Sequence, residues 1–286
     1  MLRQLLPATL RKGLRATRDK VLSPLLEVRA RSRSRHPRRG RPHNLPAELI
    51  VSLTSYPARF GTLYLTLGCL LDQTVKPDRV ILWIAHDDML RLPPAVRALE
   101  KAGLEIRACD DLRSFKKLVP ALEAFPDAFI VTADDDIFFR RNWLEELVDG
   151  FEPHVIACHR AHRMKRSANG NLEPYLDWEF DVQDSAARKP STDIMPTGGA
   201  GALYPPRSLD VRVTDRELFL RLCPTGDDLW FYWCARMAGT RHQKVGRKIQ
   251  LTPWPGSQRS TLWTSNELGG NDAALAVLQR EFGYLE

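Results

Sequence analysis

Residues 129–136 read Phe-Ile-Val-Thr-Ala-Asp-Asp-Asp, a short run of strand-forming residues followed by three acids. Its first five residues form the short apolar, β-branched run that is typical of a strand buried on both faces. Three carboxylates follow directly, so they would stand at the carboxyl end of that strand. In open parallel sheets, ligands bind just outside the carboxyl ends of the strands. The stretch therefore predicts both a buried parallel sheet and the edge of it at which a site is expected.

The chain before this stretch repeats an alternation of strands and helices. Strands are predicted over residues 49–54, 79–84, 104–108 and 128–132, and helices over residues 60–71, 93–101 and 114–124. Strands that alternate with helices at short intervals favour a parallel sheet that is covered on both faces. We therefore expect an α/β fold with a mostly parallel central sheet.

Charge divides the chain of 286 residues into two parts. Residues 1–42 hold 13 Lys or Arg and 2 acidic residues, a net charge of +11. Because the whole chain carries +7, residues 43–286 carry −4. We expect a basic N-terminal tail over residues 1–42, partly helical or disordered, and one domain over residues 43–286.

Within the tail, leucines recur at four-residue spacing between basic residues, which predicts a short basic amphipathic helix. These are Leu2, Leu6, Leu10 and Leu14. Residues 29–41 alternate Arg with Ser, Pro and Gly and predict a disordered linker. An anionic membrane surface is the favoured partner, and a solvated tail without a partner is the alternative. Nucleic acid is not expected, because no aromatic residue stands between the basic ones to stack on bases.

Cysteine usage and hydropathy indicate the compartment. The five cysteines are widely spaced and form no CxxC pair, so they predict neither a zinc site nor a disulfide framework. No segment approaches eighteen consecutive apolar residues. Arg11 and Lys12 come too early for the apolar part of a secretory signal. We expect a cytoplasmic protein, with the tail on the inner face of a membrane.

The acidic triplet predicts a metal site. Two like charges about 4 Å apart near a protein surface repel by roughly 4 kcal/mol, so a cation is expected among three adjacent carboxylates. Mg²⁺ and Mn²⁺ prefer oxygen ligands and commonly bridge to substrate phosphates. In an extended chain the first and third side chains face the same way, so Asp134 and Asp136 would share the metal, with Asp135 turned aside. The alternative is a solvated acidic turn.

Two further motifs follow predicted elements. In residues 110–117, Asp110 or Asp111 could accept from a nucleobase N–H, and Lys116 or Lys117 could meet a base carbonyl or a phosphate; the alternative is a helix that Ser114 caps. In residues 197–206, glycines permit a close approach of the backbone to a ligand; the alternative is an ordinary tight turn.

Residues 225–228 read Thr-Gly-Asp-Asp before a predicted helix. Thr225 and Asp228 have the spacing of a capping box. One aspartate here could instead be the general base that deprotonates an acceptor hydroxyl. The two roles can fall to different aspartates and stay open at this point.

Taken in order, these features resemble the GT-A fold glycosyltransferases, especially bacterial enzymes similar to glycosyltransferase family 2. The resemblance covers roughly residues 47–286. It rests on residues 51–59 as the opening strand and loop, residues 70–73 and Pro77 as the first helix and its exit, and then residues 116–117, 134–136, 198–206, 226–228 and 269–272.

The resemblance implies a Rossmann-like nucleotide-diphospho-sugar transferase fold and a role for each motif. Asp134 would contact the donor ribose, Asp136 would bind Mn²⁺ or Mg²⁺, and Asp228, beside Asp227, would be the base. The remaining donor-binding residues would be Thr54, Tyr56, Arg59, Asp111, Lys117, Asp135 and Gly199. The candidates for a further metal ligand are His242, Asn271 and Asp272.

The implied activity is metal-dependent transfer of a sugar from a nucleotide-sugar donor to a hydroxyl of a glycan or lipid-linked acceptor, with inversion. Bacterial surface polysaccharide or lipopolysaccharide synthesis is the expected setting. A nucleotidyltransferase that makes a nucleotide-sugar is one alternative, although such enzymes open with a glycine-rich loop and residues 52–59 contain no glycine. The other alternative is a non-catalytic protein that binds anionic surfaces.

Overall fold

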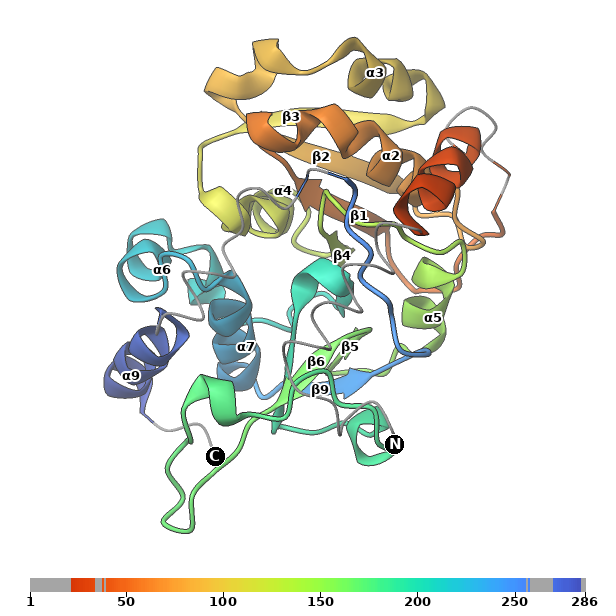
Figure 1. Ribbon diagram of the computed structural model, residues 1–286. Coiled ribbons are helices and arrows are strands. Elements are labelled where there is room, and N and C mark those ends of the chain that lie inside the picture. The colour runs from red at the N-terminus through yellow and green to blue at the C-terminus, as the bar shows by residue number, and fades with distance from the viewer. Residues whose placement is uncertain (1–21, 34–37, 39, 256, 258–269, 284–286) are drawn as a thin grey trace.

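Seven strands form one central sheet, in the order β3-β2-β1-β4-β8-β5-β9 (Figure 1). The computed structural model describes residues 22–33, 38, 40–255, 257 and 270–283. The strands of this sheet are β1 (Leu49–Thr54), β2 (Arg79–Ala85), β3 (Leu104–Cys109), β4 (Phe129–Ala133), β5 (Val155–Cys158), β8 (Ala202–Tyr204) and β9 (Arg241–Lys244). All pairings are parallel except those of β8, which runs antiparallel to β4 and β5. The expected α/β fold with a mostly parallel sheet is confirmed.

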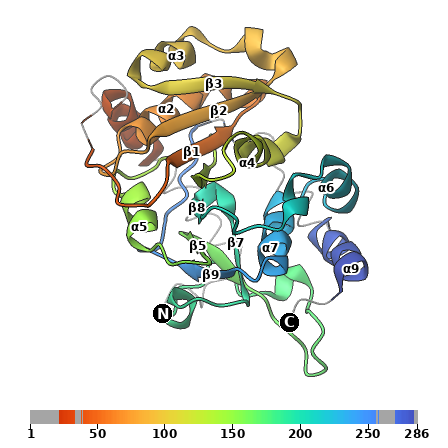
Figure 2. The same ribbon diagram turned by 180° about the vertical axis from the view of Figure 1, so that it is seen from behind.

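Helices cover both faces of the sheet (Figures 1 and 2). One face packs against α2 (Phe60–Leu71), α3 (Pro94–Arg97) and α5 (Trp143–Asp149). The other packs against α4 (Val119–Ala124), α6 (Arg216–Leu222), α7 (Asp227–Met237) and α9 (Asn271–Phe282). Strand β1 serves both cores, because Leu49, Val51 and Leu53 face the first set and Ile50 the second.

Short 3₁₀ segments and a small second sheet complete the fold. The 3₁₀ segments are η2 (Pro57–Arg59), η3 (His86–Arg91), η4 (Ala98–Ala102), η5 (Arg113–Lys117), η6 (Tyr175–Asp177), η7 (Ala186–Arg188), η8 (Gly198–Ala200) and η9 (Val211–Thr214). Strands β6 (Ala161–Arg163) and β7 (Ile194–Pro196) pair antiparallel. The helix expected over residues 114–124 is divided into η5 and α4, and Ser114 makes no cap hydrogen bond.

The antiparallel strand β8 brings separate loops together at one edge. Its first residue, Ala202, pairs with Thr132 near the end of β4 and with Cys158 at the end of β5. The segments just before β8 and just after β4 and β5 therefore meet at the carboxyl edge of the sheet. This edge is where the sequence predicted a site.

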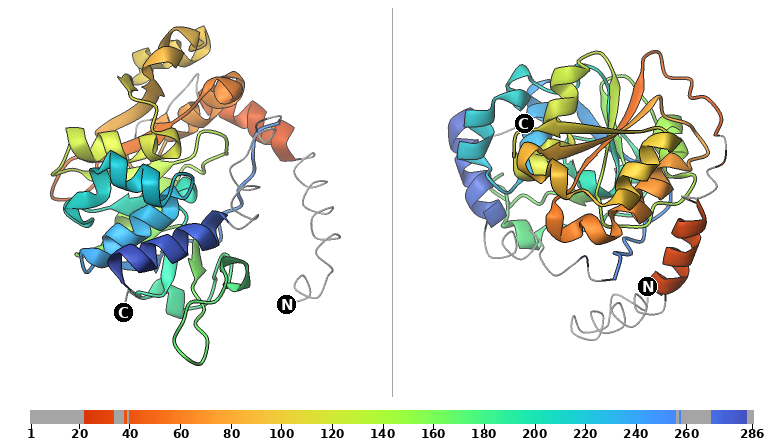
Figure 3. Two further views of the ribbon diagram at one scale, coloured as in Figure 1. Left: turned by 90° about the vertical axis from the view of Figure 1, so that its left-hand side faces the viewer. Right: turned by 90° about the horizontal axis from the view of Figure 1, so that it is seen from above.

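The N-terminal part corrects one expectation. Residues 22–33 are helical, and Ala30 and Arg33 in this helix are buried. Figure 3 shows the helix in red, beside the orange α2. The Arg33 guanidinium lies 2.7 Å from Asp72 Oδ2 and also donates to the carbonyl oxygens of Cys69, Asp72 and Phe139. The expected disordered linker is thus wrong over residues 29–33, because a guanidinium that finds several acceptors can be buried.

The rest of the tail gives fewer results. The helix predicted from Leu2 to Leu14 lies outside the described residues, and the boundary after residue 42 stays a prediction. In the part of the chain that the structure describes, no helix is both long and apolar enough to cross a membrane. All five cysteines are free, and four of them are buried.

Candidate functional site

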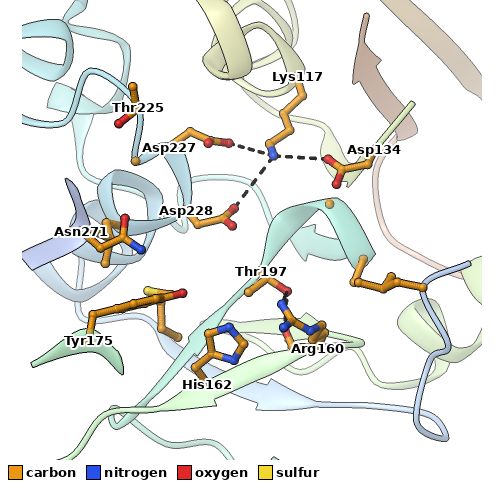
Figure 4. Close-up of a pocket in the computed structure, with 16 residues that line it drawn as sticks. Lys117, Asp134, Arg160, His162, Tyr175, Thr197, Thr225, Asp227, Asp228 and Asn271 are labelled. Atoms are coloured by element: carbon orange, nitrogen blue, oxygen red, sulfur yellow. Dashed lines mark hydrogen bonds and ion pairs between the residues drawn. The ribbon is translucent and has the colours of Figure 1, made fainter. Parts of the chain in front are cut away.

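A cavity of about 160 Å³ opens at the carboxyl edge of the sheet, beside the start of α7 (Figure 4). Three carboxylates and one lysine occupy one end of it. Asp134 follows β4, Asp227 and Asp228 begin α7, and Lys117 ends η5. Three separate segments of the sequence thus meet here, and we call these four residues the Lys117 cluster.

The Lys117 amine lies among the three carboxylates. Its Nζ is 2.8 Å from Asp227 Oδ2, 3.7 Å from Asp134 Oδ1 and 3.9 Å from Asp228 Oδ1. Burial alone would lower the pKa of this amine, but the three negative charges raise it well above its usual value. Lys117 therefore stays charged and is held in place by the acids around it.

Asp228 has the environment of a base. Its Oδ1 accepts a hydrogen bond of 3.0 Å from the backbone N–H of Gly198. Burial raises the pKa of the Asp228 carboxyl to about 6, with the charge of Lys117 opposing and that of Asp227 adding to the shift. The capping-box reading is wrong: Gly226 is the N-cap of α7, and no side chain caps this helix.

The three adjacent aspartates divide between two cations. Asp134 turns to Lys117, whereas Arg59 Nη1 lies 2.9 Å from Asp135 Oδ1 and 2.7 Å from Asp136 Oδ2. Ser55 also donates to Asp135, at 2.5 Å. We call Ser55, Arg59, Asp135 and Asp136 the Arg59 cluster. Strand β4 ends at Ala133, so the alternation of an extended chain does not govern these side chains.

Both acids of the Arg59 cluster have raised pKa values because they are buried. Burial raises the pKa of the Asp136 carboxyl to about 7, and the charge of Asp134 adds to the shift while Arg59 opposes it. The effect of Asp134 on Asp136 indicates that the two clusters are electrostatically coupled. Together they place five carboxylates against two fixed cations.

Gly199 makes room for Asp134. A Cβ at this position would lie 1.9 Å from Asp134 Oδ2, so only glycine fits here. The backbone N–H of Asp134 donates to the Gly199 carbonyl at 3.0 Å. The glycine-rich segment thus closely approaches the Asp134 carboxylate, and its expected approach to a ligand stays a prediction.

Several predicted donor-binding residues lie outside the cavity lining. The Thr54 hydroxyl donates to the Trp83 carbonyl at 2.8 Å, and Tyr56 packs under the Arg59 guanidinium, 5.6 Å from its ring centre. Asp111 is exposed and binds Lys116 at 2.6 Å. Of the predicted site residues, the structure gathers around the cavity Lys117, Asp134, Gly199, Asp227, Asp228 and Asn271.

The candidates for a further metal ligand separate. His242 is fully buried and stacks on Tyr232, with ring centres 5.0 Å apart, and it does not line the cavity. Asp272 accepts the backbone N–H of Tyr175 at 2.7 Å, whereas Asn271 lines the cavity. Residues 266–269 of this motif lie outside the described residues.

Four residues at the other end of the cavity were not predicted from the sequence: Arg160, His162, Tyr175 and Thr197 (Figure 4). Arg160 comes two residues after β5, a strand that runs parallel to β9. The rule that pointed to the acids after β4 would have pointed here too. The four-residue strand β5 has no strong sequence signal of its own, so the position of Arg160 after a strand could not be predicted.

The described acids form no complete metal site, since Asp134 pairs with Lys117 and Asp136 with Arg59, but their oxygens are of the kind that a divalent cation prefers. Among the residues that the structure describes, no three His, Cys, Asp or Glu side chains are grouped to hold a metal ion. Asp134 and Asp136 are coupled carboxylates in a region of excess negative charge, and hard cations accept such oxygen ligands. An ion here would take its remaining ligands from a bound substrate and from water.

Comparisons with known proteins place no family on the chain. No protein-family model and no curated protein matches the sequence. Similar solved structures include 4-diphosphocytidyl-2C-methyl-D-erythritol synthase from Anaerococcus prevotii (TM-score 0.44, 13% identity, 80% of this chain and 96% of that one). Another is S. aureus TarS 1–349 in complex with UDP-GlcNAc (0.44, 11%, 83% and 73%), and a third is the inositol-1-phosphate CTP transferase from T. maritima (0.39, 9%, 83% and 98%). Likeness at this level assigns no activity.

Proposed function

We propose that the chain is a metal-dependent glycosyltransferase that moves a sugar from a nucleotide-sugar donor to a hydroxyl of a glycan or lipid-linked acceptor, with inversion. The observation that carries this proposal is the Lys117 cluster. Asp134 and Asp228 come from distant parts of the sequence and meet around one lysine beside one cavity. In open parallel sheets ligands bind at the carboxyl edge, so acids at this edge can contact a bound donor and can act as a base.

In this proposal Asp228 is the general base. The Gly198 N–H fixes the carboxylate, and the raised pKa makes it a better proton acceptor than an ordinary aspartate while it stays ionised at neutral pH. The attacking hydroxyl gives its proton to Asp228 and forms a bond to the anomeric carbon. The bond from that carbon to the diphosphate oxygen breaks, and the nucleoside diphosphate leaves. Asp227 keeps Lys117 in place beside the base.

Asp134 and Asp136 would hold Mn²⁺ or Mg²⁺. Such an ion supplies positive charge that stabilises a diphosphate leaving group. Thr54 ends β1, and Tyr56 and Arg59 follow it at the same edge of the sheet, which supports a role for this loop near the nucleotide. Asp111 is proposed only as an outer contact, since its carboxylate is exposed.

A screen of nucleotides by thermal shift tests the proposal. We expect one nucleoside diphosphate to raise the melting temperature in the presence of Mn²⁺, and the rise to disappear with EDTA. Transfer from the matching nucleotide-sugar then follows by product analysis. A response to a nucleoside triphosphate with release of pyrophosphate would support a nucleotidyltransferase instead. No response to any nucleotide would contradict both.

We further propose that the N-terminal segment contacts an anionic membrane, which would bring a lipid-linked acceptor of surface polysaccharide or lipopolysaccharide synthesis close to the enzyme on the inner face. The helix of residues 22–33 exposes Leu25 and Val28, at 65% and 68%, next to the exposed Arg29. Exposed apolar and basic side chains on one helix suit a membrane surface.

A deletion tests this segment and the non-catalytic alternative together. The cut belongs after residue 21, because Arg33 is bonded into the body of the protein. We expect the shortened chain, carrying in addition Leu25→Gln and Val28→Gln, to lose co-sedimentation with vesicles that contain phosphatidylglycerol and to keep transfer in solution. Equal sedimentation of both chains would contradict membrane contact. Loss of nucleotide binding on deletion would favour a protein whose function lies in its tail.

A further inference from the structure

The end of the cavity opposite the Lys117 cluster is rich in hydrogen-bond donors. In Figure 4, Arg160, His162, Tyr175 and Thr197 lie across the cavity from Asp227 and Asp228. Arg160 Nη1 donates to the Thr197 hydroxyl at 3.1 Å, which fixes the guanidinium at the cavity wall. We call Arg160, His162, Tyr175 and Thr197 the donor wall. The cavity thus has a strongly acidic end and a second end of opposite character.

His162 presents a buried N–H at this wall. Its Nδ1 accepts the backbone N–H of Asp181 at 3.1 Å, so in the neutral ring the proton is on Nε2. Burial and the charge of Arg160 lower the pKa of His162 to about 3, which keeps the ring neutral. The side chain is fully buried, and Nε2 has no hydrogen-bond partner. A buried donor without a partner costs free energy that a ligand can recover.

Arg160 adds a permanent positive charge. A guanidinium stays charged at every physiological pH and matches carboxylate and phosphate oxygens with its planar set of donors. Its charge acts on Tyr175 as well as on His162, so its field extends along the wall. The acids at the far end of the cavity would repel an anion, which leaves the donor wall as the place for one.

We propose that the acceptor carries an anionic group, a carboxylate or a phosphate, which binds Arg160 and His162 while its nucleophilic hydroxyl faces Asp228. This inference rests on the proposed function and adds the chemical class of the acceptor. The two ends of the cavity then orient the acceptor by opposite charges, so neutral sugars would be poor substrates.

Three probes that share one sugar skeleton test the inference: D-glucose, D-glucuronate and D-glucose 6-phosphate. Their binding to the full chain is measured by saturation-transfer NMR, without any donor. We expect one or both anions to bind at least about tenfold more tightly than glucose, since hydrogen bonds to charged groups are among the strongest. The two anions separate carboxylate from phosphate. Equal binding of all three probes would overturn the inference.

Variants assign the effect to the wall. Arg160→Gln should remove the preference for anions, and Arg160→Lys should keep part of it. Arg207→Gln is the matched control. It removes the same charge from a side chain that is exposed and does not line the cavity. His162→Phe should weaken anion binding by about tenfold, as it removes the Nε2 donor. Unchanged anion binding in Arg160→Gln would refute the role of the wall.

The outcome is separable from that of the proposed function. If nucleoside diphosphate and Mn²⁺ stabilise the protein while glucose binds as tightly as the anions, only the acceptor class is wrong. If the anions bind but no nucleotide does, the proposed activity is wrong. Displacement of the anions by a nucleoside diphosphate without metal would show that the donor wall binds the nucleotide-sugar and not the acceptor, and would overturn the inference.

Discussion

The Lys117 cluster and the Arg59 cluster use the same ingredients differently. Each surrounds one cation with aspartates, the buried Lys117 or the partly buried Arg59, and the acidic triplet contributes to both. In the Lys117 cluster the carboxylates face a cavity and come from two distant segments. In the Arg59 cluster they are neighbours in the sequence, and both are buried. Adjacent residues thus serve separate tasks, because the chain changes direction directly after β4.

The two clusters differ in how their negative charge is compensated by cations and hydrogen bonds. Burial raises the pKa of both Asp135 and Asp136, that of Asp136 to about 7, although Arg59 pairs with both carboxylates and Ser55 also donates to Asp135. In the other cluster, three acids share Lys117, and the pKa of Asp228 is raised to about 6. We read the Lys117 cluster as the reacting part and Asp136 as the place where an added cation gives most relief.

The largest effect is expected in the Lys117 cluster. Asp228→Asn should lower the transfer rate by about 10²–10⁴-fold, the usual contribution of a general base, and leave nucleotide binding intact. Rates with the nucleotide-sugar found in the screen, beside thermal shifts, check this. Asp127→Asn is the control, because Asp127 is exposed and far from the cavity. A variant as fast as the wild type would remove Asp228 from the mechanism.

Removing either central cation should separate the clusters in stability. Lys117→Met leaves three carboxylates without their common partner and should lower the free energy of unfolding by about 3–5 kcal/mol. Arg59→Met leaves two carboxylates without their common partner and should lower the free energy of unfolding by less. Urea unfolding measures both, with Lys101→Met, at an exposed site, as the control. A larger loss in Arg59→Met would reverse the ranking of the clusters.

Metal addition should act through Asp136. Mn²⁺ at about one hundred times its dissociation constant should stabilise the fold by about 2.7 kcal/mol. Asp136→Asn should abolish this gain, and Asp127→Asn should keep it. Because the ligand must be ionised, the gain should shrink as the pH falls through about 7, where Asp136 takes up its proton. An equal gain in Asp136→Asn would place the metal elsewhere.

The smallest effect is a shift in the pH profile. The base works only when ionised, so the transfer rate should fall about tenfold per pH unit below about 6. The charge of Asp227 helps to raise the pKa of Asp228, so Asp227→Asn should move this limb to lower pH. Rates between pH 4.5 and 8 measure the shift. A limb that moves to higher pH would contradict the coupling between the two carboxyls.

The strands were predictable because their signals are local. The run before the triplet and residues 79–84 are largely apolar, whereas residues 104–108 alternate apolar and charged side chains after Gly103. All three strands appear within a residue or two of their predicted ends. The short strands β5 and β9 were not predicted, because strands of four residues hold too few residues for a periodic pattern.

The acids of the candidate site were predictable from the sequence, whereas its hydrogen-bond donors were not. Aspartates that follow a strand or begin a helix have a position that the sequence fixes. Their partners depend on how the backbone turns after Ala133, which no local pattern gives. Arg160 and His162 join the cavity through the pairing of β5 with β8, a contact between segments more than forty residues apart.

The anchoring of Arg33 has a mechanical consequence. Its guanidinium holds three carbonyl oxygens and one carboxylate, from α2 and from the segment before α5, so the helix of residues 22–33 meets the body at one angle. Whatever that helix rests on would then set the direction in which the cavity opens, and not only its distance from the surface. Substitution of Arg33 would remove the contacts that fix the angle between this helix and the body, and would leave the residues of the Lys117 cluster unchanged.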